Sequence, residues 1–407
     1  MKTNFVKKTL PNGLRVIFEK TKKNNIVINV GVKVGMLDET PETNGVSHFL
    51  EHMLWDGTAT KTAKEIRDAV KDMNGEFNAC TGYEITNYYV EVPRKHFEKA
   101  LQLIIGVITN PKLNEEEINK EKNIILNEKT MYFDAPFYRI DNLTKSTLFE
   151  GTMLGNDIIG TNENIQKMTK QMLEEHYNKY YSPNNTVITV IGNIEGPTEK
   201  IQNLYTTQPK KIPETKKVEP KVILPKKIIQ TADTLATYVQ LGYLTVNFEK
   251  KESKALKIIE YLLDEGKNTS IMEEVRYNHG LTYDVHTYSH SLRTTGLFAV
   301  GLSTEKSEIN RSLELIKKQI QKIQEIKKPE IEKAKREIIK SIKECLKEPS
   351  LKVLVYTDNE LTNGWDEYLN VEKKLKAITL EDVKQTAKTY LTENNSIEAI
   401  IEQKEEK

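Results

Sequence analysis

The stretch His48-Phe49-Leu50-Glu51-His52-Met53-Leu54-Trp55-Asp56-Gly57 decides the architecture of this chain, because its pattern recurs in the second half. The second copy reads Lys257-Ile258-Ile259-Glu260-Tyr261-Leu262-Leu263-Asp264-Glu265-Gly266. Two further pairs of segments match in the same order, 101–104 with 313–316 and 117–122 with 330–335. A repeat of this kind indicates two structural units built on one fold.

The fold class follows from the order of the patterns within each copy. Strand-like alternation at 13–34 and at 237–246 is followed by the repeated helical stretch and then by a second strand region, at 77–92 and 282–302. Long amphipathic helices complete each copy. Strands followed by runs of helices predict an α+β protein. We therefore expect two homologous domains, each a largely antiparallel sheet with helices packed on one face.

A proline- and lysine-rich stretch near the middle of the chain separates the two copies. Residues 206–227 contain four prolines and little apolar content, which is typical of a linker. A length of 407 residues also favours more than one domain. The sequence thus predicts an N-terminal repeat at 1–205, a linker at 206–227 and a C-terminal repeat at 228–407.

The histidines of the first copy have the spacing of a metal site. On a helix, residues three and four apart share a face, so His48 and His52 can direct two imidazoles at one ion while Glu51 flanks it. This H-x-x-E-H order is the inverted zinc-protease signature. The alternative is a chance pair of helical histidines. The second copy has Lys257 and Tyr261 at the two histidine positions, so only the first half is expected to bind metal.

A third ligand is expected from the predicted helix at 114–132. Glu121 and Glu128 are seven residues apart, and they share the face that carries its isoleucines. Acidic residues on an apolar face require a partner. The matching positions of the second copy are Ala334 and Ser341, so both acids are lost where both histidines are lost. This joint loss indicates that the acids and histidines act together, and it leaves open which acid binds the metal.

Several motifs together resemble the pitrilysin/insulinase family of zinc peptidases, which includes small two-repeat bacterial and archaeal peptidases and the subunits of mitochondrial processing peptidase. The resemblance rests on Leu10–Leu14, His48–His52, Asn78-Ala79 with Thr81, Glu84 and Thr86–Tyr89, Asn110-Pro111, and Glu121–Glu128. The chain departs from the family pattern at Lys122 and Asn127, where arginine and glutamate are usual. Neither is a ligand position, so these departures affect only the local support of the helix.

The resemblance implies a role for each acidic residue of the site. It makes Glu128 the third ligand, beside His48 and His52, of one Zn²⁺ per chain, and it places Glu121 in support of the site. Such an ion lowers the pKa of its water to about 7. Glu51 is then the general base that takes the water's proton and passes it to the leaving amine.

The resemblance also implies residues that bind the substrate. Arg276 and Tyr283 of the second half correspond to a pair that holds the peptide and its developing oxyanion. An arginine and a phenol are good donors to carbonyl oxygens. Asn78 and Ala79 correspond to an edge strand on which an extended peptide can pair. Such pairing contacts mainly backbone, so broad specificity for short or unfolded peptides is expected.

The expected function is therefore that of a zinc metalloendopeptidase. Two alternatives stay open: a non-catalytic partner subunit of a heterodimeric processing peptidase, and a zinc hydrolase that acts on something other than peptides. Because the family encloses peptides between two two-repeat bowls, we expect a homodimer, or a heterodimer with a sister subunit. In the homodimer, the Arg276 and Tyr283 region of one chain would face the zinc of the other.

Composition narrows the partners and the compartment. The 60 basic and 59 acidic residues leave a net charge of +1, so neither nucleic acid nor an anionic membrane is an expected partner. The lysine-rich run 317–347 has interleaved glutamates and is interpreted as a solvated helix. Two distant cysteines, no signal-like start and no long apolar run favour a cytoplasmic protein without a membrane span. His286 and His290 are interpreted as ordinary polar residues.

Overall fold

The computed structural model describes residues 5–214, 220 and 222–404. The strands of the first sheet are β1 (Phe5–Thr9), β2 (Arg15–Lys20), β3 (Asn25–Val32), β4 (Glu76–Thr81), β5 (Thr86–Pro93) and β6 (Thr186–Gly192). The strands of the second sheet are β7 (Lys226–Ala232), β8 (Thr237–Thr245), β9 (Val285–Ser291), β10 (Gly296–Thr304) and β11 (Ser396–Gln403).

The α-helices are α1 (Val46–Trp55), α2 (Ala63–Asp72), α3 (Phe97–Thr109), α4 (Glu115–Asp134), α5 (Pro136–Leu148), α6 (Asn162–Lys167), α7 (Lys170–Tyr180), α8 (Thr198–Leu204), α9 (Lys251–Glu265), α10 (Ile309–Lys322), α11 (Lys328–Cys345), α12 (Pro349–Asp358), α13 (Trp365–Ala377) and α14 (Leu380–Tyr390). Both helices predicted to carry site residues, α1 and α4, are present. Short 3₁₀ and π segments connect many of these elements.

The chain divides into two compact units that are not simply its two halves. The described residues of the first unit are 5–129, 157–214 and 344–369, and the remainder forms the second. The first unit therefore contains α12 from the C-terminal half, and the second contains α5 from the N-terminal half. Within the predicted linker 206–227, β7 already begins at Lys226, and residues 215–219 and 221 lie outside the described residues.

The first sheet has the strand order β1-β2-β6-β3-β5-β4. All neighbouring strands are antiparallel except β2 and β6, which are parallel. β4 lies at one edge and pairs with β5 in a register that sets Asn78 opposite Tyr89. Most of β3 is fully buried, which is typical of a strand covered on both faces.

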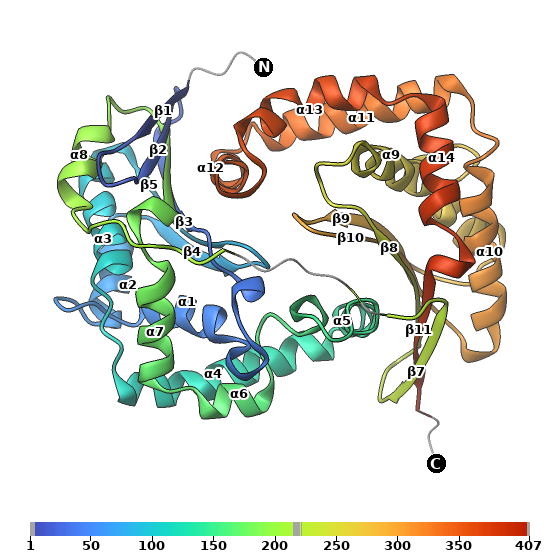
Figure 1. Cartoon of the computed structure of the whole chain (residues 1–407), viewed down its shortest axis with the longest axis horizontal. Helices are drawn as coiled ribbons and strands as arrows, with labels where there is room; N and C mark the ends of the chain where they lie inside the picture. Colours follow the sequence, from blue (N-terminus) through green and yellow to red (C-terminus); the bar gives the residue numbers. More distant parts are fainter. Residues whose placement is uncertain (1–4, 215–219, 221, 405–407) are drawn as a thin grey trace. The chain divides into compact units, whose positions relative to one another are not determined.

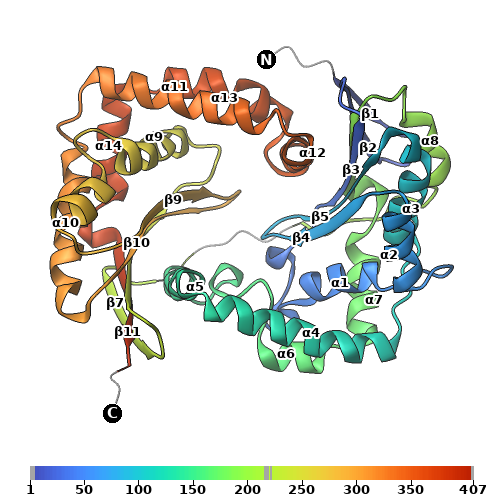
Figure 2. The same ribbon diagram turned by 180° about the vertical axis from the view of Figure 1, so that it is seen from behind.

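Helices cover both faces of this sheet (Figure 1 and Figure 2). On one face, α1, α3 and α7 pack their apolar stripes against the even-numbered residues of β3, such as Ile28 and Val30. On the other face, α12 packs against β3 and β6. There a buried polar cluster joins the helix to the sheet. Asn29 Nδ2 donates to Asn87 Oδ1 at 2.9 Å and to Thr357 Oγ1 at 2.9 Å, and Asn87 Nδ2 donates to Asp358 Oδ1 at 3.0 Å.

The second sheet repeats this plan with the order β7-β11-β8-β10-β9, again antiparallel except for one parallel pair, β7 and β11. The helices α9, α10 and α14 pack on one face and α5 on the other. The prediction of an α+β fold with two largely antiparallel sheets is confirmed. The helix on the second face of each sheet was not anticipated, because it comes from the other half of the chain.

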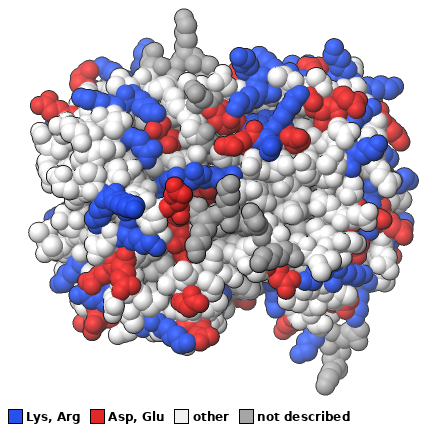
Figure 3. Space-filling model, in the orientation of Figure 1, with Lys and Arg blue, Asp and Glu red and all other residues white. Residues whose placement is uncertain are grey.

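Charged side chains of both signs are interspersed on the face of the molecule in Figure 3, as near-equal numbers of acids and bases lead one to expect. Among the described residues, no helix is both long and apolar enough to cross a membrane. Cys80 and Cys345 are both free thiols.

Candidate metal centre

The helix α1 holds the two predicted histidine ligands in a rigid setting. Its apolar residues recur at helical spacing, and Val46, Phe49, Leu50, Met53 and Leu54 are all almost completely buried. This packing fixes the rotation of α1 about its own axis. The rings of His48 and His52 consequently project from one side of the helix, with their centroids 4.7 Å apart.

Glu128 on α4 meets the two histidines. Its Oε2 lies 3.2 Å from His52 Nε2 and 3.7 Å from His48 Nε2. Within the described part of the chain, these three residues form the one group of histidine, cysteine and carboxylate side chains whose ligand atoms lie close enough to hold a metal ion, all within 4.8 Å of one another. The two histidines hold the pKa of Glu128 well below its ordinary value, so this carboxylate is ionised.

The donor set fits zinc. Zinc–ligand distances of about 2.0–2.1 Å in a tetrahedral site place neighbouring donor atoms roughly 3.3 Å apart, close to the separations from Glu128 to the two imidazoles. Glu128 Oε2 is buried and accepts no hydrogen bond that satisfies normal geometry from any described residue. A buried carboxylate oxygen without such a donor calls for a cation. Two imidazoles and one carboxylate leave a fourth position for water or substrate.

Glu121 is the other acid of α4 that the spacing allowed as a metal ligand. It contacts the opposite nitrogen of the His52 ring from the one that Glu128 contacts. Its Oε1 is 2.6 Å from His52 Nδ1, so the Nδ1 proton is directed at Glu121, and Nε2 is the nitrogen left to bind a metal. Burial lowers the pKa of His52, but its contacts with the carboxylates of Glu121 and Glu128 outweigh this and raise it to about 10. Without a metal the ring is therefore a cation, and a metal ion that binds Nε2 displaces the proton from that atom. Burial and the charge of Glu121 raise the pKa of the nearby Asp56 to about 7.

Glu51, the predicted general base, lies on α1 close to His48, His52 and Glu128. It is almost buried on α1, and burial raises the pKa of its carboxyl above the ordinary value. The hydroxyl of Thr81, on the edge strand β4, donates to Glu51 Oε2 at 2.5 Å. Thr81 thus orients this carboxylate. The motif quoted above contains Thr81, but no role was predicted for it; its position three residues after Asn78 on the same strand was the available signal.

The predicted substrate residues Asn78 and Ala79 lie on β4, whose only partner strand among the described residues is β5. The amide N–H of Ala79 donates to Asn78 Oδ1 at 2.8 Å, so this donor is directed away from β5. It is therefore available at the sheet edge to a chain that displaces the Asn78 side chain.

A further acid, Glu39, fixes the start of α1 and was missed by the sequence analysis. Its Oε2 accepts from the N–H of Gly45 at 2.8 Å and its Oε1 from the N–H of Ser47 at 2.9 Å. These are N–H groups that a helix start leaves without intrahelical partners. Burial raises the pKa of Glu39 to about 7, although the hydrogen bonds from Gly45 and Ser47 oppose this shift. The signal in the sequence was an acid shortly before an apolar helix.

In the second unit, the residues that correspond in the repeat to the metal ligands also lie close together, but they do not form a metal site among the described residues. Lys257, Glu260, Tyr261 and Ser341 line a cavity of about 730 Å³. Lys257 Nζ donates to Glu260 Oε2 at 2.9 Å, so an ion pair stands where the first unit has a histidine beside its glutamate. A metal-ligand cluster is absent from this unit over its described residues.

Arg276 and Tyr283 are brought together in the second unit. The guanidinium of Arg276 lies 4.4 Å from the centre of the Tyr283 ring, and Tyr283 is 79% exposed. Arg276 belongs to the short π-helical segment η6 (Glu273–Asn278), and Tyr283 precedes β9. His286, considered and rejected as a ligand, instead contacts Gln240 Oε1 at 2.9 Å through its Nε2.

Two family models match the chain in sequence. Residues 15–162 match the model described as insulinase, peptidase family M16, and residues 167–338 match the M16 inactive domain. The chain belongs to peptidase family M16. The first match contains the whole cluster of His48, His52 and Glu128. The second contains Lys257 and Tyr261, which replace the two histidines in the repeat. The resemblance deduced from the motifs is thereby confirmed.

Curated relatives resemble the chain over nearly all of its length or over about half of it. An uncharacterised zinc protease of Bacillus subtilis, YmxG, is 28% identical and aligns over 96% of this chain and 97% of the relative. A probable β subunit of mitochondrial processing peptidase from Arabidopsis thaliana is 33% identical, over 49% of this chain and 38% of that protein. These relatives support a metalloprotease.

Solved M16-type structures share the fold. A protease from Helicobacter pylori superposes with a TM-score of 0.88 at 21% identity, covering 98% of this chain and 99% of that one. A putative M16-like peptidase from Alicyclobacillus acidocaldarius gives a TM-score of 0.86 at 19% identity, with 99% of both chains covered.

Proposed function

We propose that this protein is a zinc-dependent endopeptidase that hydrolyses short or unfolded peptides. The observation that carries the proposal is the convergence of His48, His52 and Glu128 on one point beside the nearly buried carboxylate of Glu51. Zinc bound there would supply a Lewis acid that makes water acidic near neutral pH and polarises the scissile carbonyl.

The residues of the chain perform the remaining steps. Glu51, held by Thr81, accepts a proton from the attacking water and returns it to the leaving amine. Glu121 keeps the proton of His52 on Nδ1 and so keeps Nε2 free for the metal. The open edge of β4 can pair with an extended peptide through its backbone and so carry the scissile bond along the strand towards Glu51.

The intact ligand set supports an active peptidase over the alternative of a non-catalytic partner subunit. We propose Arg276 and Tyr283 as the donors that hold the peptide carbonyls and the developing oxyanion. The proposed assembly is a homodimer in which this pair acts on the metal centre of the other protomer.

The test is cleavage of an internally quenched unstructured peptide by the purified chain, with zinc content measured on the same sample. We expect about one zinc per chain, and activity that a chelator abolishes and added Zn²⁺ restores. Glu51→Gln should keep its zinc and lose at least about a hundredfold in turnover, since general acid–base catalysis contributes roughly 10²–10⁴-fold. A zinc-loaded wild-type chain that cleaves no peptide, or a fully active Glu51→Gln variant, would refute the proposal.

A further inference from the structure

The two histidines of the metal centre are held in different ways. His52 has a partner on its second ring nitrogen, because Glu121 Oε1 lies 2.6 Å from Nδ1. Nδ1 of His48 is buried and has no hydrogen-bond partner among the residues that the structure describes. A metal-binding histidine usually donates from its second nitrogen to a partner that fixes the orientation of the ring. The orientation of His48 therefore depends on the backbone that carries it, which is the first turn of α1.

Ser47, the residue before His48, connects this turn to two other parts of the first unit. Its side chain is 1% exposed, and its Oγ lies 3.0 Å from Nε2 of His176 on α7. Its backbone N–H donates to Glu39 Oε1 at 2.9 Å. One residue of the first turn is thus hydrogen-bonded both to a neighbouring helix and to the segment that precedes α1.

His176 is buried in a way that suits a fixed hydrogen bond between uncharged groups. Burial lowers its pKa to about 3, so the ring is neutral near pH 7 and can pair with the Ser47 hydroxyl as donor or as acceptor. The helix α7 lies beside α1 in Figure 1 and Figure 2, and the hydroxyl of its Tyr180 donates to the carbonyl of Asp38 at 3.0 Å. Through His176 and Tyr180, α7 therefore contacts both Ser47 and the residue before Glu39.

The segment 157–160 connects the start of α1 to α4, which supplies the third predicted ligand. The contact with Gly45 is so close that a Cβ atom there would lie 2.4 Å from the carbonyl oxygen of Ile159. Lys129, the residue after Glu128, donates to another carbonyl of the same segment. The first turn of α1 is thus fixed with respect to the turn of α4 that carries Glu128, and a shift of either turn would change the geometry of the metal site.

We propose that Ser47 and His176 are positioning residues, which direct His48 at the metal by fixing the first turn of α1. The proposal rests on the proposed function, since it takes His48 as a zinc ligand. Both residues act through the backbone of α1, whereas the ring of His52 has Glu121 as its own partner. The rival interpretation is that the hydrogen bond stabilises the fold and has no effect on metal binding.

The test is the zinc affinity of the full-length chain, measured by competition with a chromophoric chelator. Ser47→Ala and His176→Leu each remove one side of the hydrogen bond and should weaken zinc binding roughly tenfold, at the low end of the effect of losing support for a ligand. The double variant should be little weaker than either single variant, because both changes remove the same link. His176→Gln should bind zinc within about threefold of the wild type, because its amide can donate and accept near the position of Nε2.

Bound Co²⁺ provides a second measurement, which a loss of stability alone would leave unchanged. Its visible absorption spectrum depends on the geometry of its ligands. The spectrum of the Co²⁺-loaded protein should change in Ser47→Ala and in His176→Leu, and it should match the wild type in His176→Gln. A thermal melt of the metal-free proteins measures the stability of each variant separately.

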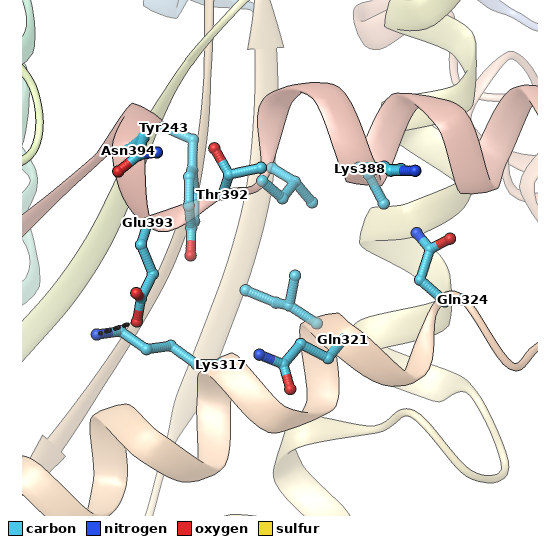
Figure 4. A pocket seen from close by; sticks show the side chains of 11 residues that line it. Tyr243, Lys317, Gln321, Gln324, Lys388, Thr392, Glu393 and Asn394 are labelled. Atoms are coloured by element: carbon cyan, nitrogen blue, oxygen red, sulfur yellow. Dashed lines mark ion pairs between the residues drawn. The ribbon is translucent and has the colours of Figure 1, made fainter.

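Two variants of the second unit, which contains no predicted metal ligand, are the controls. Ser312→Ala removes a fully buried helical hydroxyl that lies 3.3 Å from Thr304 Oγ1, so it repeats the substitution made at Ser47. Tyr243→Phe removes the hydroxyl of a residue that lines a cavity of about 560 Å³ between α10 and α14 (Figure 4). Both controls should keep the zinc affinity and the Co²⁺ spectrum of the wild type, whatever they do to stability.

The outcomes separate this inference from the proposed function. A wild-type chain that binds no zinc would refute the proposed function itself. A zinc-binding wild type, with Ser47→Ala and His176→Leu at the same affinity and with the same Co²⁺ spectrum, would overturn the inference alone. Equal weakening of zinc binding by Ser312→Ala would assign the effect to lost stability and would also overturn it. Ser47→Ala, the smallest change, decides the result if His176→Leu does not fold.

Discussion

Gly31 of β3 and Thr357 of α12, far apart in the sequence, are in such close contact that a Cβ atom on Gly31 would lie 2.2 Å from Thr357 Cγ2. The second unit has the same arrangement: a Cβ on Gly242 of β8 would lie 2.6 Å from Thr144 Cγ2 of α5. In each unit, a glycine in a strand allows the helix from the other half of the chain to lie close to the sheet. Each sheet therefore has a glycine at the point where it contacts the helix that comes from the other half of the chain, α12 in the first unit and α5 in the second.

Gly31→Ala should destabilise the protein by about 1–3 kcal/mol, the usual cost of overpacking a rigid core. Thr357→Ser removes the methyl group in question and keeps the hydroxyl that receives the hydrogen bond from Asn29. The double variant should therefore recover part of the lost stability. Urea denaturation of the four proteins measures the coupling.

The control for the glycine experiment is Gly106→Ala. Gly106 is interior to α3 and a Cβ there would meet no atom within 4 Å, so alanine should stabilise the protein by about 0.5–1 kcal/mol. If Gly31→Ala were as harmless as Gly106→Ala, or if Thr357→Ser gave no recovery, the close packing of α12 would not limit stability.

Glu128→Gln and Glu121→Gln should separate the roles of the two acids of α4. A neutral amide is a poor ligand beside a carboxylate, so Glu128→Gln should lower the zinc content measured by atomic absorption to near zero after dialysis. Glu121→Gln should retain zinc with an affinity reduced by roughly 10–100-fold, the usual effect of losing the partner of a ligating histidine. A zinc-free Glu121→Gln beside a fully loaded Glu128→Gln would reverse the assignment.

Glu39 should make the stability of the protein depend on pH. Its pKa is about 7 in the fold and 4.5 in the unfolded chain, so between these values the folded state binds more protons and the free energy of unfolding falls as pH rises. The difference of 2.5 pKa units corresponds to about 3 kcal/mol, an order-of-magnitude figure. Below pH 4.5 this loss is absent, and above pH 7 it is complete.

Glu39→Gln cannot ionise, so its stability should fall less than that of the wild type between pH 4.5 and 7. Urea denaturation of both proteins at several pH values gives the difference in slope. Parallel curves would mean that Glu39 is ionised at the start of α1 over the whole range.

Mixed dimers test the proposed sharing of sites between protomers. Glu51→Gln and Arg276→Ala should each be nearly inactive alone. If Arg276 acts on the metal centre of the other protomer, a mixed dimer contains one site with both parts intact and regains up to half of the wild-type activity per dimer. Tagged, co-purified heterodimers that hydrolyse no quenched peptide, or a monomeric wild type with full activity, would contradict this assembly and leave the zinc chemistry standing.

The amino-acid sequence by itself determined the features that depend on local periodicity. The spacing of His48, Glu51 and His52 assigns them to adjoining positions on one helix whatever surrounds it, and the internal repeat requires two similar units. The loss of histidines and acids from the second copy restricts the metal centre to the first. For the same reason Glu121 and Glu128 were recognised as partners of the histidines, but a shared helix face could not tell one from the other.

Only the tertiary structure decided which atoms meet. Glu121 reaches His52 Nδ1 while Glu128 reaches the Nε2 atoms of both histidines, because the tertiary structure sets which turn of α4 lies beside each histidine of α1. The contacts of Thr81 with Glu51, of Glu39 with the start of α1 and of Gly31 with Thr357 join segments with no common periodicity. Local patterns determine which face of an element is buried, but the partner of that face is chosen by the packing of the whole chain.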